Sequence, residues 1–187
     1  DASCDWSSDV CSSDLTWTFD LNGNQKDIFY TYKVNIAGVW NEAVDPYARS
    51  VSINGDKGAV IDLKDTTPEK WKPSEKPNFT NLTDAIIYEL HVRDFSIDQN
   101  SGMENKGKFL AFTETGTKGT DGTKTGVDYI KALGITHVEL MPIFDYASVD
   151  ETSKKPQFNW GYNPKNYNAP EGSYSTDPYN QIGRAHV

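Results

Sequence analysis

Cysteine, histidine and long apolar runs are scarce in this chain. Its 187 residues include two cysteines and three histidines. No apolar segment approaches the roughly 20 residues that cross a bilayer, so we predict no transmembrane helix. Cationic residues are also few, with 18 lysines and arginines against 27 acidic residues and a formal net charge of −9. This balance offers no basic surface to nucleic acid or to an anionic membrane, and neither is expected as a partner.

Both cysteines, Cys4 and Cys11, lie in a segment that does not resemble natural protein. It matches the translation of a common sequencing-library adapter, and the last six residues match the same adapter from the opposite strand. We therefore interpret residues 1–15 and 182–187 as adapter-derived artefacts. Without them the insert, from Thr16 to about position 181, has no cysteine. Its formal net charge changes from −9 to −6, because four aspartates and one arginine are removed. This composition leaves the compartment undetermined, bacterial cytoplasm or secreted.

The first part of the insert alternates apolar and polar residues in the way typical of β-strands. Residues 28–36 are rich in β-branched and aromatic side chains, and residues 50–53 and 59–63 are shorter segments of the same kind. The last two flank an Asn-Gly pair at 54–55, and these residue types accept the positive φ angles of tight hairpin turns. We predict an all-β segment over residues 16–63, with too few strands to close a sandwich by itself.

Residues 64–83 differ in composition from the segments on either side. Three prolines recur there among polar residues, and Trp71 and Phe79 are the expected anchors to a surface. Proline-rich polar segments of this kind often connect domains. We therefore predict a linker at residues 64–83.

Apolar strands and a helix follow the predicted linker. Residues 85–92 and 135–143 form nearly continuous apolar runs, and residues 126–133 place their apolar side chains on one helical face. Gly134 ends this helix. A strand, a helix and a second strand with few polar breaks predict two parallel, buried strands of an α/β sheet.

Four segments together carry a resemblance to a known family. The longest, residues 158–178, contains FNWGYNP, then NY, PEGSY and STDP. In this stretch the chain resembles type I pullulanases, which are starch-debranching glycoside hydrolases of the α-amylase superfamily. Residues 88–95 and 134–142 are similar to the first and second strands of that family's catalytic barrel. Residues 39–49 are similar to the closing part of the β-sandwich that precedes the barrel.

The resemblance implies both a fold and a function. The fold is α/β with an all-β N-terminal part: the last strands of a glucan-binding-type β-sandwich at 16–63, then the first (βα) units of an incomplete (β/α)8 barrel at 84–181. The function is hydrolysis, with retention, of α-1,6-glucosidic links. The implied partners are α-glucans such as pullulan, starch and glycogen limit dextrins. An isoamylase or a glycogen branching enzyme is an alternative, as is a non-catalytic glucan-binding protein.

Trp160, Tyr162 and Asn163 are the candidate substrate-binding residues. Loops at the carboxyl ends of barrel strands build the active face, and this loop follows the second strand. A glycine frees the backbone before Tyr162, and Pro164 restricts it soon after. In the family the corresponding tyrosine stacks on the glucose at the cleavage point, so the resemblance implies this role for Tyr162. For Trp160 and Tyr167 packing onto the barrel rim is favoured.

Two positions depart from the family's usual pattern, and three further polar residues are expected to have supporting roles. Asn163 stands where the family usually has aspartate, so it can hydrogen-bond but carries no charge. Phe158 likewise replaces a usual tyrosine. His91 and His137 lie in predicted strands and are expected to be core or supporting histidines. Asp94 is expected to pair with the neighbouring arginine or to cap a helix.

No residue of this chain matches the family's catalytic carboxylates. A retaining glycosidase needs two carboxyl groups about 5 Å apart, and the resemblance implies that they come from the fourth, fifth and seventh barrel strands. We therefore predict no catalytic residue here and no required cofactor, with calcium a candidate ligand of the full-length protein only. The insert holds the first quarter of a barrel that takes roughly 250 residues. We expect it to be inactive alone and, through its open apolar sheet edges, to aggregate.

Overall fold

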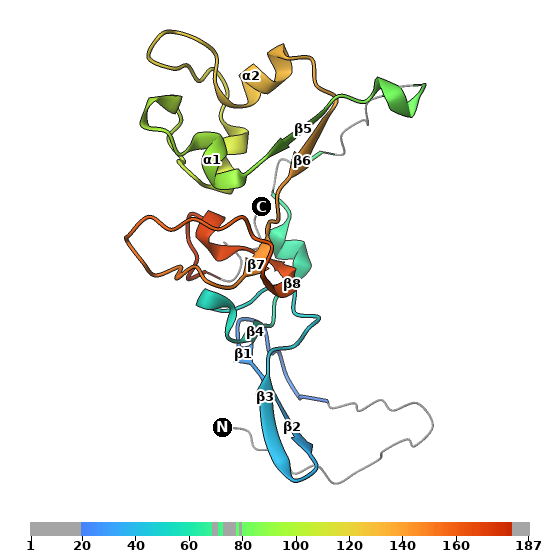
Figure 1. Ribbon diagram of the computed structural model, residues 1–187. Helices are drawn as coiled ribbons and strands as arrows, with labels where there is room; N and C mark the ends of the chain where they lie inside the picture. The colour runs from blue at the N-terminus through green and yellow to red at the C-terminus, as the bar shows by residue number, and fades with distance from the viewer. Residues whose placement is uncertain (1–19, 69–70, 73–77, 79, 181–187) are drawn as a thin grey trace.

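The computed structural model describes residues 20–68, 71–72, 78 and 80–180. Both predicted adapter segments lie outside the described residues, as does much of the predicted linker, including Phe79. Three groups of strands follow one another in Figure 1, with β1–β4 at one end, β7 and β8 in the middle, and β5 and β6 at the other end.

Four short antiparallel strands form the N-terminal part. β2 (Tyr32–Ile36) and β3 (Val39–Ala43) make a hairpin in which Ile36 pairs with Val39. The two turn residues have positive φ angles of 51° and 85°, as the tightest hairpin turns require. β1 (Phe29–Tyr30) pairs instead with β4 (Gly58–Ala59). The single strand predicted at 28–36 is thus divided in two, because its halves pair with different partners.

The Asn-Gly turn forms as predicted, whereas the strands beside it are shorter than predicted. Asn54 and Gly55 have φ angles of 59° and 68°. They lie in a 3-10 turn, η1 (Ile53–Gly55), so residues 50–53 contribute only the isolated bridge from Val51 to Gly58. The strand predicted at 59–63 is reduced to β4, and a second 3-10 helix, η2 (Leu63–Thr66), begins at its far end.

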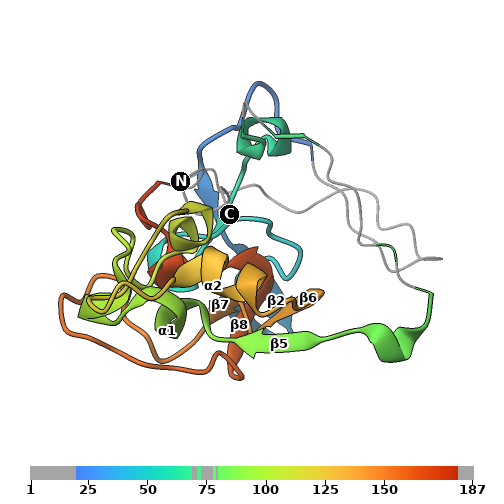
Figure 2. The same ribbon diagram turned by 90° about the horizontal axis from the view of Figure 1, so that it is seen from above.

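The predicted strand–helix–strand unit is confirmed. After the 3-10 turn η3 (Leu82–Asp84), β5 (Ile87–Leu90) pairs in parallel with β6 (His137–Leu140). Between them lie α1 (Val92–Ser96), the 3-10 turns η4 (Gln99–Ser101) and η5 (Phe109–Thr113), and α2 (Gly126–Ala132). Both helices lie on the same side of the β5–β6 ribbon, as Figures 1 and 2 show.

The prediction that these two strands are buried is wrong for this chain. Ile87 on β5 is 61% exposed and Val138 on β6 is 43% exposed. The two strands form a two-stranded sheet, and within the described residues no further strand lies beside them. An apolar strand is buried only when other elements cover it, and local sequence does not supply them.

A second hairpin lies within the stretch that was predicted to be one long loop. β7 (Phe144–Tyr146) pairs with β8 (Pro164–Pro170) in an antiparallel arrangement, and η6 (Gly172–Tyr174) follows. Tyr146 and Tyr174 pack with Val92 and Phe109 in a buried apolar cluster. This cluster joins the hairpin to α1 and η5.

The N-terminal part packs against the same hairpin from the other side. Val51 and Ala48 are buried against Ala169 of β8. The Asn166 amide donates to the Gly55 carbonyl, and the Asn168 amide donates to the Pro46 carbonyl. The β7–β8 hairpin therefore contacts both the N-terminal part and the part that holds α1 and η5, in agreement with its central place in Figure 1. No helix in the described part is long and apolar enough to cross a membrane.

Candidate functional site

Residues 158–163, here called the aromatic loop, present three large rings to solvent. Tyr162 is 65% exposed and Trp160 is 60% exposed, and Phe158 is also more than half exposed. The loop contacts the residues that follow both parallel strands, His91 after β5 and Pro142 after β6. In sheets of parallel strands, ligands bind at the carboxyl ends of the strands. The exposed rings therefore lie where a ligand is expected.

Gly161 sets the backbone that carries Tyr162. Its φ angle is +87°, a conformation that L residues rarely adopt. A Cβ atom at this position would lie 2.8 Å from the Cβ of Pro142 and 3.2 Å from a ring carbon of Tyr146. Glycine is therefore required for two reasons, the backbone conformation and the lack of space. The predicted role of this glycine in shaping the loop is consistent with both.

Two asparagine side chains tie the base of the aromatic loop to the segment after β7. The Asn159 and Asn163 amides both donate to the Ala147 carbonyl, at 2.8 Å and 3.1 Å. Asn163 also donates to the Ser148 hydroxyl and accepts from the Asn159 amide. Asn163 thus uses its amide to hold the loop. An aspartate, which lacks the amide donor, could not make these two donations.

His91 connects the aromatic loop to the buried apolar cluster. Its Nε2 atom lies 2.8 Å from the Asn159 carbonyl and 3.0 Å from the Tyr174 hydroxyl. Its Nδ1 atom accepts from the Asp94 backbone N–H at the start of α1. These partners assign the ring proton to Nε2, which donates to the carbonyl. The buried ring therefore supports the loop and caps a helix, as predicted for a supporting histidine.

Several sequence predictions differ from the structure in the burial of a side chain. Trp160 and Tyr167 do not pack as predicted, because both rings are mostly exposed, although Tyr167 contacts Phe144 at one face. His137 is exposed, and its Nδ1 atom lies 2.8 Å from the Thr136 hydroxyl, so it is not a core histidine here.

Asp94 forms the predicted ion pair, with 2.9 Å to Nη1 of the preceding arginine.

Three carboxyl groups that the sequence did not bring together meet beneath the β7–β8 hairpin. Oxygen atoms of Asp145, Glu151 and Glu171 all lie within 4.8 Å of one another. Glu171 accepts from the backbone N–H groups of Tyr146 and Ser173, and Glu151 accepts from those of Asn54 and Gly172. Asp145 and Glu151 lie six residues apart and Glu171 follows 20 residues later, and no helix or strand periodicity relates these spacings, so no local pattern indicated the cluster.

Burial changes the titration of this cluster. Desolvation raises the pKa of Glu171 to about 7, and the nearby charge of Glu151 acts in the same direction, while hydrogen bonds from Ser173 and Tyr146 oppose it. Burial also lowers the pKa of Lys108, against the attraction of Glu151 and Glu171. At neutral pH the cluster therefore retains a proton for part of the time, which reduces the repulsion among its carboxylates.

The cluster is suited to holding the backbone in place and not to hydrolysis. Its spacing resembles that of a glycosidase carboxyl pair, but Asp145 and Glu171 are almost fully buried and no substrate could contact them. Calcium takes six to eight oxygen ligands, whereas the oxygens of Glu151 and Glu171 already accept from backbone N–H groups. These hydrogen bonds give the cluster a structural role within the described residues, and calcium binding by a longer protein stays a prediction.

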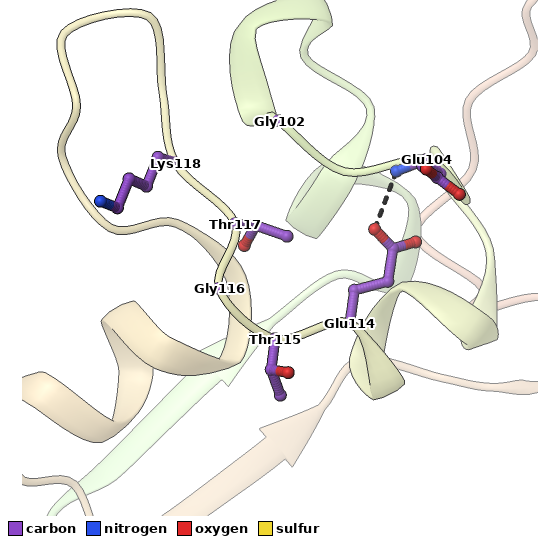
Figure 3. Close-up of a pocket in the computed structure, with 7 residues that line it drawn as sticks. All are labelled: Gly102, Glu104, Glu114, Thr115, Gly116, Thr117 and Lys118. Atoms are coloured by element: carbon purple, nitrogen blue, oxygen red, sulfur yellow. Dashed lines mark hydrogen bonds between the residues drawn. The ribbon is translucent and has the colours of Figure 1, made fainter.

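Two hollows are lined by other residues than the carboxyl cluster. One, of about 350 Å³, is lined by Gly102, Glu104 and residues 114–118. Figure 3 shows the Glu114 carboxylate directed at the Glu104 backbone nitrogen, 2.8 Å away. Burial raises the pKa of Glu114, but hydrogen bonds from the backbone of residues 104–105 outweigh it and lower the pKa overall. The Glu114 carboxylate therefore shapes the loop that lines this hollow.

The other hollow, of about 530 Å³, lies between β5 and the start of α2. Its lining includes His91, Asp94 and Tyr129, together with apolar side chains of β5 and α2. It shares His91 with the aromatic loop. Its mixed polar and apolar lining, next to the carboxyl end of β5, is compatible with a ligand that has both kinds of surface.

Comparison with known proteins explains this arrangement. The chain is 47% identical over 167 residues to a pullulanase of Bacillus subtilis (strain 168), a match that covers 88% of the chain. A solved pullulanase of Paenibacillus barengoltzii is 57% identical, with a TM-score of 0.80 over 83% of the chain. The chain is a homologue of one segment of the pullulanases. No family model matches it.

The chain spans about a quarter of the length of these pullulanases, 22% of the Bacillus protein and 24% of the Paenibacillus protein. The Paenibacillus enzyme has also been solved in complex with maltohexaose and α-cyclodextrin. An isoamylase of rice (Oryza sativa subsp. japonica) matches less well, with 26% identity over 90% of the chain. The pullulanase resemblance found in the sequence is thus confirmed, and the isoamylase alternative has weaker support.

Proposed function

We propose that this chain is part of a starch-debranching glycosidase that hydrolyses α-1,6-glucosidic links in pullulan and branched α-glucans. The observation that carries the proposal is the exposed Tyr162 ring at the carboxyl ends of two parallel strands. Gly161 and Asn163 hold the backbone on both sides of this ring. A pyranose has apolar C–H faces, and a rigid aromatic ring binds such a face at low cost in conformational entropy.

We also propose a fold, which extends the resemblance found in the sequence. Residues 16–63 are the closing strands of a β-sandwich, and residues 84–181 begin a (β/α)8 barrel whose first two strands are β5 and β6. The parallel register of these strands and the intervening helix support this assignment. The exposed apolar side chains of β5 and β6 support it too, because further barrel elements would cover them.

Tyr162 is the proposed stacking residue, and the roles of Trp160 and Asn163 follow from their contacts. Trp160 is exposed beside Tyr162 and offers a second ring to a longer glucan. Asn163 acts through the backbone, because its amide is used in holding the loop. Hydrolysis itself needs two carboxyl groups and water, and Asp145 and Glu171 of the carboxyl cluster are too buried to meet a substrate. The chain alone is therefore proposed to be inactive, and it requires no cofactor.

An exchange of segments tests this proposal. Residues 20–180 of this chain would replace the matching segment of the Paenibacillus barengoltzii pullulanase, and hydrolysis of pullulan and of glycogen would be measured. We expect the chimera to cleave pullulan. Tyr162→Ala should lower kcat/KM by roughly tenfold to a hundredfold, the loss expected when one desolvated aromatic contact is removed.

Tyr167→Ala is the matched control, because Tyr167 is equally exposed but lies on β8, outside the aromatic loop. We expect this variant to keep the activity of the parent chimera. Tyr162→Phe should also stay active, because it keeps the ring and removes only the hydroxyl. An inactive chimera that folds normally, or equal losses in Tyr162→Ala and Tyr167→Ala, would show that the proposed role is wrong.

A further inference from the structure

The N-terminal part contacts the loop after β7 through a reciprocal pair of hydrogen bonds. The Asn54 backbone N–H donates to Oε2 of Glu151, and the Glu151 backbone N–H donates to Oδ1 of Asn54, both at 2.8 Å. The Asn54 amide also donates to the Asp150 carboxylate at 3.3 Å. These residues are 97 positions apart in the sequence. The contact is therefore a feature of the tertiary structure and not of a local turn.

The turn that presents Asn54 fits closely against the β7–β8 hairpin. A Cβ atom on Gly55 would overlap the carboxylate of Asp145. Lys165 donates to the Asn54 carbonyl at 2.7 Å, and the Asn166 amide donates to the Gly55 carbonyl at 3.0 Å. These contacts allow the turn only one position on the hairpin. Asn54 is thereby fixed relative to β8.

A short path leads from this contact to the aromatic loop. The Asp150 backbone N–H donates to the Gln157 side chain at 2.8 Å, and that side chain returns a bond to the Asp150 carbonyl at 3.4 Å. Gln157 immediately precedes the aromatic loop. Residues 150–151 are thus held by Asn54 on one side and hold the start of the aromatic loop on the other. The segment between them, residues 152–156, is largely exposed.

We propose that Asn54 is a positioning residue for Tyr162, so that the N-terminal β segment orders the ring that contacts sugar. This inference rests on the proposed function for its sugar-binding part. Its structural part states only that Asn54 limits the conformational freedom of residues 147–163. A ring that is ordered before binding loses less conformational entropy when sugar binds, which raises affinity without a new contact. Asn54 acts at a distance and does not itself touch the glucan.

Hydrogen–deuterium exchange on the full 187-residue chain tests the structural part. Asn54→Gly removes both side-chain hydrogen bonds but keeps a residue that accepts a positive φ angle. We expect amides in residues 147–163 to exchange about tenfold faster, the change expected when two hydrogen bonds are lost. Amides in residues 137–141, which are β6 and the residue after it, should exchange as in the parent. Asn35→Gly, the same change on the distant β2–β3 hairpin, is the control and should leave both regions unchanged.

Maltotetraose tests the sugar-binding part. In the parent chain it should slow exchange in residues 157–163. In Asn54→Gly the maltotetraose concentration for half-maximal protection should rise about tenfold, because the entropy cost of ordering the loop is then subtracted from the binding free energy. If maltotetraose protects nothing in the parent, the sugar-binding part of this inference is overturned, whereas the debranching function is tested separately by the chimera. If residues 147–163 exchange at the parent rate in Asn54→Gly, the positioning role is overturned.

A second variant covers the case in which Asn54→Gly loosens the whole chain and residues 137–141 also exchange faster. Gln157→Ala breaks the same path at its other end, on the surface and away from the turn. We expect it to speed exchange in residues 157–163 and to raise the maltotetraose concentration for half-maximal protection, with β6 unchanged. Parent-like exchange in this variant would overturn the proposal, because the path from Asn54 would then not control the loop.

Discussion

Glu171 shows at the scale of a single residue how the fold changes ordinary chemistry. Its carboxyl group is 1% exposed and faces Glu151 and Asp145, with Lys108 and the Tyr146 and Tyr174 rings as its other titratable neighbours. Burial raises its pKa to about 7 from an ordinary value of 4.5. The protonated form is therefore favoured by folding. Its contribution to stability is present below pH 4.5 and is lost as the pH rises through about 7.

Glu171→Gln should remove this pH dependence. The glutamine side chain is neutral at every pH, so the stability of the variant relative to the parent should rise as the pH goes from 5 to 8. The gain is on the order of 3 kcal/mol at most, which corresponds to a pKa raised from 4.5 to about 7. A loss that does not depend on pH is superimposed, because the amide NH2 cannot accept one of the two backbone N–H bonds of Glu171. Thermal unfolding at several pH values measures the gain.

Glu114→Gln is the control for that experiment. The pKa of Glu114 is lowered, so its contribution is present above the ordinary pKa and is lost as the pH falls. This variant should therefore show no gain at high pH. Unfolding temperatures of Glu171→Gln and the parent that stay parallel from pH 5 to 8 would contradict the role given to Glu171.

At the scale of elements, the aromatic loop depends on one glycine and on side-chain hydrogen bonds. Gly161 gives the loop its left-handed backbone, and Asn159 and Asn163 attach its base to residue 147. The loop has little regular backbone pairing of its own, so its order comes from these few contacts. We therefore expect a change in any of these contacts to affect the structure of the aromatic loop itself.

Gly161→Ala should destabilise the chain by about 2–4 kcal/mol, because a left-handed alanine is strained and its Cβ also meets Pro142. Gly122→Ala is a matched control, since Gly122 has φ +82° with nothing within 4 Å of the added atom. It should cost only about 1 kcal/mol, the conformational part. Urea unfolding followed by circular dichroism gives both values. Equal losses would mean that the contact with Pro142 is unimportant.

At the scale of the whole molecule, apolar surface is left uncovered on two sheets. Ile87 and Val138 are exposed on the β5–β6 pair, and Val34, Ile36 and Val39 are exposed on the β2–β3 hairpin. Contiguous apolar patches and open strand edges favour association between chains. The proposed barrel and sandwich would cover these surfaces with the remainder of a longer protein.

The chain by itself should therefore self-associate. Sedimentation velocity at two concentrations should show oligomers that increase with concentration, and Ile87→Lys combined with Val138→Lys should shift the chain toward monomer. Leu82→Lys is the control, since Leu82 is equally apolar and highly exposed but lies outside both sheets. A parent chain that stays monomeric at the higher concentration would show that these surfaces do not drive association.

By itself, the sequence determined the features that depend on neighbouring residues. The α2 helix, the two strands around it, the Asn54-Gly55 turn and the resemblance carried by residues 158–178 were all evident, because periodicity, turn chemistry and motif spacing are local. The sequence also indicated Tyr162 as the candidate ring for stacking on sugar. Strand lengths at 28–36 and 50–63 were wrong, because pairing partners, and not local alternation, decided where each strand ended.

Only the tertiary structure decided how distant residues meet. The carboxyl cluster brings Glu171 against Asp145 and Glu151, which lie at least 20 positions earlier, and the pairing of Asn54 with Glu151 joins residues 97 positions apart. No local pattern encodes such contacts. Burial of Tyr174 and exposure of Trp160 were settled in the same way. Two aromatic residues of one motif differ in this because burial is a property of what the fold places around a side chain.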